Sequence, residues 1–329
     1  MNICHLILTN NFAGSEKYCS DLANYQVSNN KVLVIKAKEV NSKISIKKFL
    51  NKDIYIEEIG SFFKIYQIKK ILRKYEINII HTHLGKASKL AKYLDIPNVA
   101  TLHIDYKKKD YQHLNGLICI NQMQYEKAFN FKGPKKIIYN WLPQIEEINK
   151  NKINSLKLNI FKNDKDFIFG YFGRFNKSKN ISLLIESFVE AKLSNSKLLI
   201  IGDGEEKEKI TKKYDLNTNI VFLPTQIDIY PFYGLIDCFV LPSTFEPFGL
   251  VLLEAMHFNK QIICGNIPIS KFLPSNSVLK NYTNEEMIKM LTNKYQLGKI
   301  KINYDLSEFI REKQILKIQK FYKEIIKRN

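Results

Sequence analysis

The sequence lacks the features that define several large classes of protein. No run of about 18 consecutive apolar residues occurs among its 329 residues, so we expect no membrane-spanning helix. Its 5 cysteines are scattered and never spaced as Cys-x-x-Cys, which indicates neither a disulfide framework nor a zinc site and favours a reducing compartment. It contains no repeat, low-complexity tract or coiled-coil heptad. These absences exclude a fibrous, disulfide-stapled or membrane-spanning protein.

Signatures of nucleic-acid binding and of secretion are also missing. The sequence shows no helix-turn-helix, zinc or aromatic RNP pattern, so we expect no nucleic-acid partner. The opening MNICHLILTNNFAG has an apolar run too short for a signal-peptide core and no basic segment before it. We interpret this run as a buried first strand and expect a cytoplasmic protein.

What the sequence does have is a globular composition with a strong positive charge. Its apolar fraction is 45%, and its length is typical of two domains. Lysine and arginine number 51 against 32 acidic residues, a formal net charge of +19 that is spread over both halves of the chain. This excess favours an anionic partner, and nucleic acid, an anionic membrane or a phosphorylated substrate would each satisfy it. Compositional bias toward Lys, Asn and Ile is the alternative explanation.

Short β-branched runs alternate with segments of helical period, the pattern of doubly wound parallel sheets. In the first half the sequence predicts strands at 3–8, 32–35, 77–81, 99–102, 116–120 and 136–139, with helices at 16–27, 63–75, 86–94 and 124–130. In the second half it predicts strands at 167–172, 197–201, 220–223, 238–241 and 261–264, with helices at 181–192, 205–214, 227–235 and 249–258. The alternation breaks over 141–165. We therefore predict domains at 1–150 and 151–306 and a terminal helix over 307–329.

The densest chemical signal is the segment STFEPFGLVLLEAM, which follows a predicted strand. Gly249 opens a helix there, and the free N–H groups at a helix start bind anions. Glu246 and Glu254, eight residues apart, are placed to accept hydrogen bonds from sugar hydroxyls. The structural alternative is that Glu246 complements the helix dipole and that Glu254 is solvent-exposed. The apolar neighbours of Glu254 argue against exposure.

Two further loops follow predicted strands in the second half. Arg174 and Lys179 are candidates to converge on a pyrophosphate, although solvated loop cations are the alternative. The Gly202-Asp-Gly204 turn resembles the start of a dinucleotide-binding motif. Lys207 stands where the third glycine of that motif belongs, which weakens a nicotinamide interpretation.

Histidines end two predicted strands in the first half. His103 follows the strand at 99–102, where a histidine can hydrogen-bond a substrate hydroxyl or transfer a proton, or can be structural. His81 and His83 are expected on one side of their strand. No carboxylate or cysteine partners them in the sequence, so we predict no metal site.

Together these residues resemble a retaining glycosyltransferase of family four, over about residues 1–270. The matching positions are Gly14 within the Ala13–Glu16 loop, His103, Asn140, Gly173-Arg174 with Lys179, Gly202-Asp-Gly204, the segment 237–243, and Glu246 with Glu254. The resemblance implies the GT-B fold, in which two Rossmann-like α/β domains with doubly wound parallel sheets face each other across a cleft.

The resemblance also implies a role for each matching residue. Arg174 and Lys179 would bind the donor diphosphate in place of a metal ion, so neither a metal nor a cofactor is expected. Glu254 would bind the ribose, and the catalytic pair His103 and Glu246 would contact the transferred sugar. The remaining diphosphate contacts would come from Gly14, Phe248, Gly249 and Leu250.

The leading hypothesis is therefore a cytoplasmic glycosyltransferase that moves a sugar from a UDP- or GDP-linked donor to a glycan or lipid-linked acceptor, in the biosynthesis of lipopolysaccharide or capsule. Its basic N-terminal domain would dock on the anionic inner face of the membrane. The candidate docking residues are Lys43, Lys47, Lys48, Lys69, Lys70 and Lys107–Lys109. The alternatives are a sugar-nucleotide epimerase or phosphorylase of the same fold, and a non-catalytic basic binding module.

Overall fold

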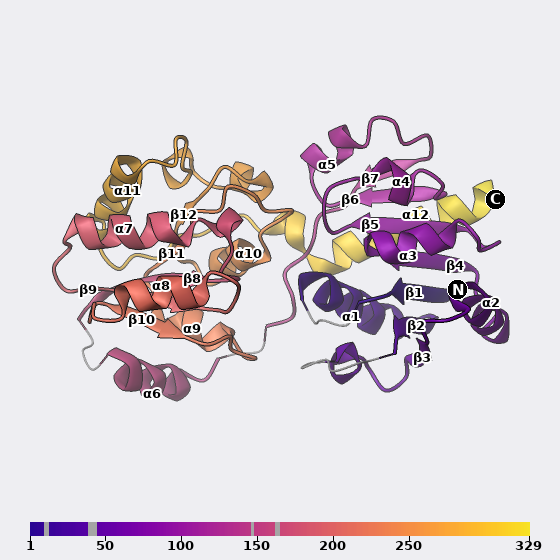
Figure 1. Ribbon diagram of the computed structural model, residues 1–329, viewed down its shortest axis with the longest axis horizontal. Helices are drawn as coiled ribbons and strands as arrows, with labels where there is room; N and C mark the ends of the chain where they lie inside the picture. Colours follow the sequence, from indigo (N-terminus) through magenta and orange to yellow (C-terminus); the bar gives the residue numbers. More distant parts are fainter. Residues whose placement is uncertain (10–12, 39–44, 146–147, 162–164) are drawn as a thin grey trace. The chain divides into compact units, whose positions relative to one another are not determined.

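The structure, a computed structural model, describes residues 1–9, 13–38, 45–145, 148–161 and 165–329. Its contacts divide the chain into two compact units. Unit 1 comprises Met1–Pro143 with Glu308–Asn329, and unit 2 comprises Gln144–Ser307 (Figure 1). The stretch that breaks the strand-helix pattern holds a helix, α6 (Lys150–Phe161), which belongs to unit 2.

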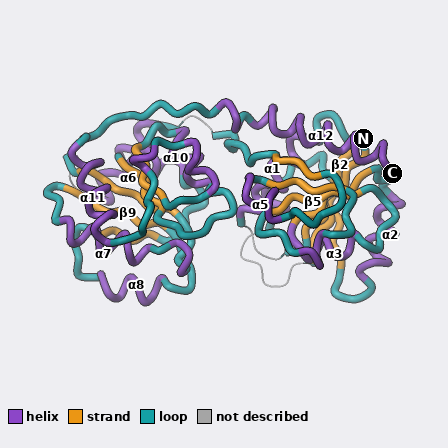
Figure 2. Tube along the Cα trace, turned by 90° about the horizontal axis from the view of Figure 1, so that it is seen from above, coloured by secondary structure: helices purple, strands orange, loops and turns teal. Residues whose placement is uncertain are grey.

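Unit 1 is built on a seven-stranded parallel sheet in the order β3-β2-β1-β4-β5-β6-β7. The strands are β1 (Asn2–Ile7), β2 (Lys31–Ala37), β3 (Tyr55–Ile59), β4 (Ile79–His83), β5 (Asn98–Leu102), β6 (Gly116–Cys119) and β7 (Lys135–Ile137). The helices are α1 (Gly14–Gln26), α2 (Lys64–Lys74), α3 (Leu84–Ala91), α4 (Lys108–Tyr111), α5 (Gln122–Lys127) and α12 (Arg311–Arg328). The strands lie inside the unit with helices and loops around them (Figure 2).

Unit 2 repeats this plan with five parallel strands in the order β10-β9-β8-β11-β12. Its strands are β8 (Phe167–Phe172), β9 (Ser196–Ile201), β10 (Ile220–Leu223), β11 (Cys238–Leu241) and β12 (Gln261–Cys264). Besides α6, its helices are α7 (Ile181–Ala191), α8 (Lys207–Tyr214), α9 (Tyr230–Leu235), α10 (Leu250–His257) and α11 (Asn284–Gln296). The predicted pair of α/β halves with doubly wound parallel sheets is confirmed. Among the described residues, no helix combines the length and apolarity that crossing a membrane requires.

The sequence prediction missed β3, α6, α11 and the short helix α4, and it ended β4 too early. The edge strand β3 carries Glu57 and Glu58 between apolar residues, so it lacks the apolar run that marks a buried strand. In α6, Phe161 is the buried residue, so its apolar pattern is weak. β4 runs to His83, two residues beyond the predicted end, because its polar His-Thr-His end is fully buried.

Each sheet reverses its strand order once, and ligands of such sheets bind beside this reversal at the carboxyl ends of the strands. In unit 1 the reversal lies between β1 and β4, and in unit 2 between β8 and β11. The loop that contains Gly14 and the residue His83 therefore lie at the reversal of unit 1. The loops that contain Arg174 and Glu246 lie at the reversal of unit 2.

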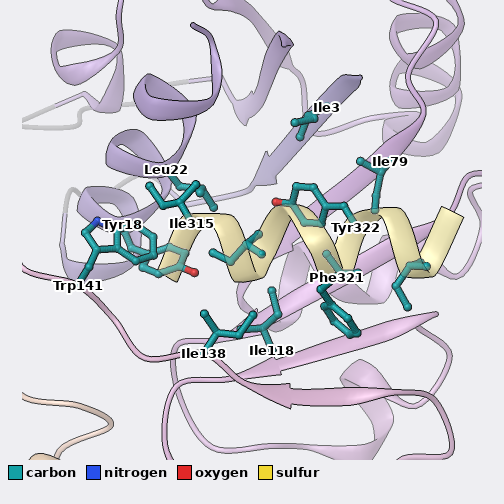
Figure 3. Packing of buried hydrophobic residues seen from close by; sticks show 13 residues of the cluster. Ile3, Tyr18, Leu22, Ile79, Ile118, Ile138, Trp141, Ile315, Phe321 and Tyr322 are labelled. Atoms are coloured by element: carbon teal, nitrogen blue, oxygen red, sulfur yellow. The ribbon is translucent and has the colours of Figure 1, made fainter. Parts of the chain in front are cut away.

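The last helix, α12, completes the core of unit 1. Its buried residues Ile315, Phe321 and Tyr322 belong to one apolar cluster with Ile3 and Ile118 of the sheet (Figure 3). A Cβ placed on Gly116 of β6 would lie 2.8 Å from Ile325 Cδ1 and 2.9 Å from Phe321 Cζ, so glycine is what allows α12 to pack this closely. The segment that follows unit 2 in the sequence is thus an integral part of unit 1.

We expect Phe321→Ala to destabilise unit 1 by about 3–5 kcal/mol, the usual cost of truncating a buried phenylalanine. Trp141, the only tryptophan of the sequence, is buried in the same cluster, so its fluorescence follows the unfolding of unit 1. The urea midpoint of the fluorescence change should fall. Leu316→Ala, on the half-exposed side of α12, is the matched control and should shift the midpoint little. Equal shifts in both variants would contradict the packing described.

Candidate active site

Two loops of unit 2 meet at the reversal of its sheet. The loop after β8 makes a 3-10 turn at Lys177–Lys179, and Asn180 follows it with φ 52°, a left-handed conformation that asparagine tolerates. The loop after β11 is tied to this turn by the N–H of Thr244, which donates to the carbonyl of Ser178 at 2.9 Å. This contact brings the Lys179 ammonium against the Glu246 carboxylate as an ion pair.

The Lys179–Glu246 pair is nearly enclosed by protein. The side chains of Lys179 and Glu246 are 15% and 11% exposed. An ammonium has three N–H donors, so pairing with one carboxylate leaves Lys179 able to bind a further anion. Arg174, in contrast, is exposed. The Tyr171 hydroxyl donates to the Arg174 carbonyl at 2.9 Å, and burial together with the Glu246 charge raises the pKa of Tyr171.

Gly202 and Gly204 have a packing role beside Arg174. A Cβ on Gly202 would lie 1.9 Å from the Gly173 carbonyl oxygen, and one on Gly204 would lie 2.3 Å from that of Phe175. The N–H of Phe175 donates to the Asp203 carbonyl at 2.9 Å. The two glycines therefore let the loop after β9 bond to the loop that carries Arg174, which is a sufficient structural reason for both.

Helix α10 begins beside the ion pair. Gly249 precedes it with φ 94°, a conformation that favours glycine. Phe248 is buried, whereas Leu250, the first residue of the helix, is partly exposed. The helix thus begins directly after a glycine, as the sequence predicts, and anion binding at this terminus stays a prediction.

Glu254 lies one turn into α10 and is only 3% exposed, so the alternative of a solvent-exposed Glu254 is wrong. Its carboxylate accepts a hydrogen bond of 2.9 Å from the Tyr233 hydroxyl of α9. Burial and the Glu254 charge raise the pKa of Tyr233, which keeps this hydroxyl protonated as the donor. Tyr233 was not predicted from the sequence, since nothing in its local pattern distinguishes it from a core aromatic.

In unit 1, Gly14 starts α1 at the reversal of the sheet. A Cβ on Gly14 would meet no atom of the described residues within 4 Å, so these residues leave room beside its backbone. Glu16 closes the first turn, because its carboxylate accepts from the Ala13 N–H at 3.0 Å and from the Ser15 hydroxyl at 2.9 Å. The start of α1 therefore already has one negative charge of its own.

Three buried histidines, His5, His81 and His83, and the partly exposed His103 form a row next to the end of β4. His103 Nε2 lies 3.0 Å from His83 Nδ1, and His83 Nε2 lies 3.1 Å from His5 Nδ1. His81 stacks on His83 with ring centroids 4.5 Å apart. Its two nitrogens lie 2.5 Å from the Tyr322 hydroxyl and 2.8 Å from that of Thr101.

Burial keeps these histidines neutral. It lowers the pKa of His5 to about 4 and that of His103 to about 3, and it lowers the pKa of His81 and His83 well below the ordinary value of 6.5. The neighbouring histidines lower the pKa of His81 and His83 further. Each ring is therefore a hydrogen-bonding group with one donor and one acceptor nitrogen at neutral pH.

His5, like Tyr233, was not predicted from the sequence. It lies opposite His81 in the parallel register of β1 and β4, and alternation places both side chains on one face. Within the described residues, His5, His81 and His83 have nitrogens close enough together to hold a metal ion. Hydrogen bonds already occupy both nitrogens of His81, and those of His5 and His83 join the row, so the donor set fits a hydrogen-bond network better than a metal.

Because His5 titrates differently when unit 1 unfolds, we expect the stability of this unit to depend on pH. An unfolded histidine binds a proton near pH 6.5, whereas buried His5 binds one only near pH 4. The free energy of unfolding should therefore fall as the pH falls below 6.5, by about 2 kcal/mol at pH 5 from His5 alone. Urea unfolding followed by Trp141 fluorescence at pH 7 and pH 5 measures this loss. His5→Gln should reduce the difference between the two pH values by a similar amount, and an undiminished difference would show that His5 is not the cause.

Part of the chain matches a known family. Residues 153–275 match the family model for glycosyl transferases group 1. An uncharacterized glycosyltransferase of Methanocaldococcus jannaschii is 27% identical over 61% of this chain and 58% of its own length. The alpha-monoglucosyldiacylglycerol synthase of Acholeplasma laidlawii is 26% identical over 82% of this chain and 80% of its own. The capsular polysaccharide biosynthesis glycosyltransferase CapM of Staphylococcus aureus is 35% identical, over 37% and 33%.

Solved structures match the whole chain. Anabaena Alr3699/HepE in complex with UDP has a TM-score of 0.80 at 16% identity, covering 98% of this chain and all of that one. A glycosyltransferase from Rickettsia africae has a TM-score of 0.80 at 18% identity, covering 100% and 99%. At such identities the likeness shows the fold, which is GT-B. Residues 153–275 thus resemble a group 1 glycosyltransferase domain, the chain has the GT-B fold, and its similarity to named glycosyltransferases supports a transferase activity.

Proposed function

We propose that this glycosyltransferase transfers a sugar from a nucleotide-linked donor, UDP- or GDP-linked, with retention of the anomeric configuration. The observation that carries the proposal is the enclosed Lys179–Glu246 pair beside the start of α10. A cation next to a helix N-terminus stabilises the charge that a departing diphosphate gains. The family resemblance supplies the expectation of retention, and the UDP in the Anabaena structure supports a nucleotide at this fold.

Each site residue then has a specific task. Lys179, with two donors left beside Glu246, and exposed Arg174 neutralise the diphosphate as the bond to the sugar breaks. The backbone of Phe248, Gly249 and Leu250 at the start of α10 adds N–H donors to the phosphate. No metal ion is then needed for charge neutralisation.

The sugar and the ribose are bound by the carboxylates and the histidine. Glu246 accepts from sugar hydroxyls while Lys179 holds its other side, and buried Glu254, oriented by Tyr233, accepts from the ribose. In unit 1, neutral His103 contacts the transferred sugar, and the room beside the Gly14 backbone admits the phosphate.

We further propose that the acceptor is a glycan or a lipid-linked glycan of a surface polysaccharide such as lipopolysaccharide or capsule. One relative is named for capsular polysaccharide biosynthesis, and another is named a glucosyldiacylglycerol synthase, which includes a lipid. Such an acceptor lies at the inner face of the cell membrane, where this protein would work from the cytoplasm.

Thermal shifts with UDP, GDP, ADP and their common sugar conjugates test the donor site, because a ligand of the folded state raises the melting temperature with its concentration. We expect one nucleotide family to stabilise the wild type and not Lys179→Ala. Lys177→Ala, an exposed lysine of the same turn, is the matched control and should keep the full shift. No shift with any nucleotide would contradict the proposed site.

The rate of sugar transfer tests the Lys179–Glu246 pair as well. Lys179→Ala and Glu246→Gln should each lose about 100-fold or more in rate while melting as folded proteins, and the wild type should keep its rate in excess chelator. Rates near wild type in both variants would show that this pair is not at the reacting centre. Loss of activity in chelator that Mn²⁺ restores would overturn metal independence alone.

A candidate membrane-docking surface surrounds the start of α2. Phe62, Phe63 and Tyr66 are 79%, 84% and 70% exposed. Phe62 and Phe63 directly precede α2, and Tyr66 shares an outward helical face with Lys70 and Arg73, both exposed, opposite the buried side that contains Ile68. Aromatic side chains beside cations are the composition of a helix that lies in an anionic lipid interface.

The lysines predicted for docking divide into two groups. Lys47 pairs with Glu58 at 2.9 Å and Lys69 with Asp95 at 3.1 Å, so these two already have carboxylate partners. Lys48, Lys70 and Lys107–Lys109 are exposed, and Lys43 lies outside the described residues. We therefore place the lipid contact at Phe62, Phe63, Tyr66, Lys70 and Arg73.

Flotation with vesicles tests this surface. We expect binding to vesicles that contain phosphatidylglycerol, weak binding to purely zwitterionic vesicles, and at least tenfold weaker binding after Phe62→Ser with Phe63→Asn. Asparagine suits position 63 because Phe63 has φ 52°. Phe129→Ser removes an equally exposed phenylalanine of unit 1 and should change nothing. Binding that ignores anionic lipid would exclude this surface.

A further inference from the structure

The buried histidines of unit 1 form a continuous chain of hydrogen bonds that ends at Gln26. His103 Nε2 is bonded to His83 Nδ1 at 3.0 Å, and His83 Nε2 to His5 Nδ1 at 3.1 Å. His5 Nε2 is then bonded to the Gln26 side-chain oxygen Oε1 at 2.8 Å. Gln26, His5 and His83 are fully buried, so water does not compete for these contacts.

In such a chain, the nitrogen that carries the proton on one ring determines which nitrogen must carry it on the next ring. The Gln26 oxygen only accepts, so His5 must hold its proton on Nε2. A neutral His5 then has a lone pair on Nδ1, which requires a proton on His83 Nε2. His83 then has its lone pair on Nδ1, which requires a proton on His103 Nε2. The lone pair of His103 is therefore on Nδ1.

We propose that Gln26 fixes the tautomer of His103 through His5 and His83, so that His103 carries its proton on Nε2 and offers Nδ1 as a hydrogen-bond acceptor. Gln26, His5 and His83 are positioning residues that act through His103. The catalytic consequence rests on the proposed contact of His103 with the donor sugar: an acceptor at Nδ1 selects a sugar hydroxyl that donates. A reversed chain would present an N–H donor at the same place.

The surroundings hold the rings in this arrangement. His83 is stacked on His81, which is itself bonded to Tyr322 and Thr101. The Tyr18 ring lies edge-on to His103 with centroids 4.9 Å apart. Directly after His83, Leu84 has φ 68°, a strained conformation for a leucine that persists only where its surroundings enforce it.

The proposed tautomer of His103 also requires every ring of the chain to be neutral, and burial keeps the rings neutral. The pKa of His5 is lowered to about 4, and that of His83 falls well below its ordinary value. A proton added to any ring of the chain would turn an acceptor nitrogen into a donor and reverse the order beyond it. Between pH 6 and pH 8 the donors and acceptors of the chain therefore have one order, which is determined by Gln26 at its buried end.

Long-range proton–nitrogen NMR of the full chain, labelled with ¹⁵N in its histidines, distinguishes the two neutral tautomers. The His103 signals are identified by their loss in His103→Asn. We expect the wild type at pH 7 to show His103 protonated on Nε2 alone. In Gln26→Met, which keeps the side-chain length but removes the oxygen, both tautomers should appear. Thr101→Val is the matched control: it removes a hydroxyl from the same cluster, off the chain, and should leave the His103 tautomer unchanged.

A proton on His103 Nδ1 in the wild type, or an unchanged single tautomer in Gln26→Met with Trp141 fluorescence as in the wild type, would overturn the proposal. This readout does not depend on sugar transfer. In the transfer assay Gln26→Met should lower kcat/KM about five- to tenfold, the worth of one hydrogen bond, and leave the nucleotide thermal shift in place. A changed tautomer with an unchanged rate would instead overturn the contact of His103 with the sugar.

Discussion

The reversal of strand order in each sheet separates neighbouring loops at its carboxyl edge, and the Lys179–Glu246 pair and the start of α1 lie at these openings. In unit 2 the reversal lies between β8 and β11, and the bond from Thr244 to Ser178 joins the two loops across it. The pairing of β8 with β11 and this bond together bring Lys179 to Glu246, which is 67 residues away in the chain. In unit 1 the same topological step places His83 beside the start of α1. Strand order thus determines where the candidate sites lie, and the side chains determine what they can bind.

Unit 1 has to bury a polar row beneath two helices, and the terminal helix makes this possible. A buried donor or acceptor without a partner costs about 1–3 kcal/mol, so four histidines under α1 and α12 would be very unfavourable if left unpaired. Tyr322 of α12 supplies the hydroxyl for His81, and Gln26 at the end of α1 supplies the oxygen for His5. The apolar residues of α12 seal the same region from water. Helix α12 therefore provides both apolar packing and a polar partner, and α1 provides the second partner.

The local sequence pattern predicted the helices and strands whose own residues are apolar enough to indicate that they are buried. The strands β8, β10, β11 and β12 have the predicted bounds, because each is an apolar run flanked by polar turns. β3 and α6 escaped prediction because their burial is partial and depends on neighbours. The same limit applies to the site. Glu246 and Glu254 stand out in one motif, whereas His5 and Tyr233 matter only through partners, His83 and Glu254, that lie far away in sequence.

The two units differ in how they handle charge, and this difference bears on what the net charge of +19 does. The site of unit 2 is ionic, with an enclosed ammonium and two buried carboxylates, as a leaving diphosphate requires. The histidine row of unit 1 is neutral, because burial prevents its rings from taking up protons. Among the exposed cations of unit 1, Lys70 and Arg73 lie on the exposed face of α2 beside exposed aromatic rings. Positive charge on such a face fits an anionic surface outside the protein, and this is why we propose α2 as the membrane contact.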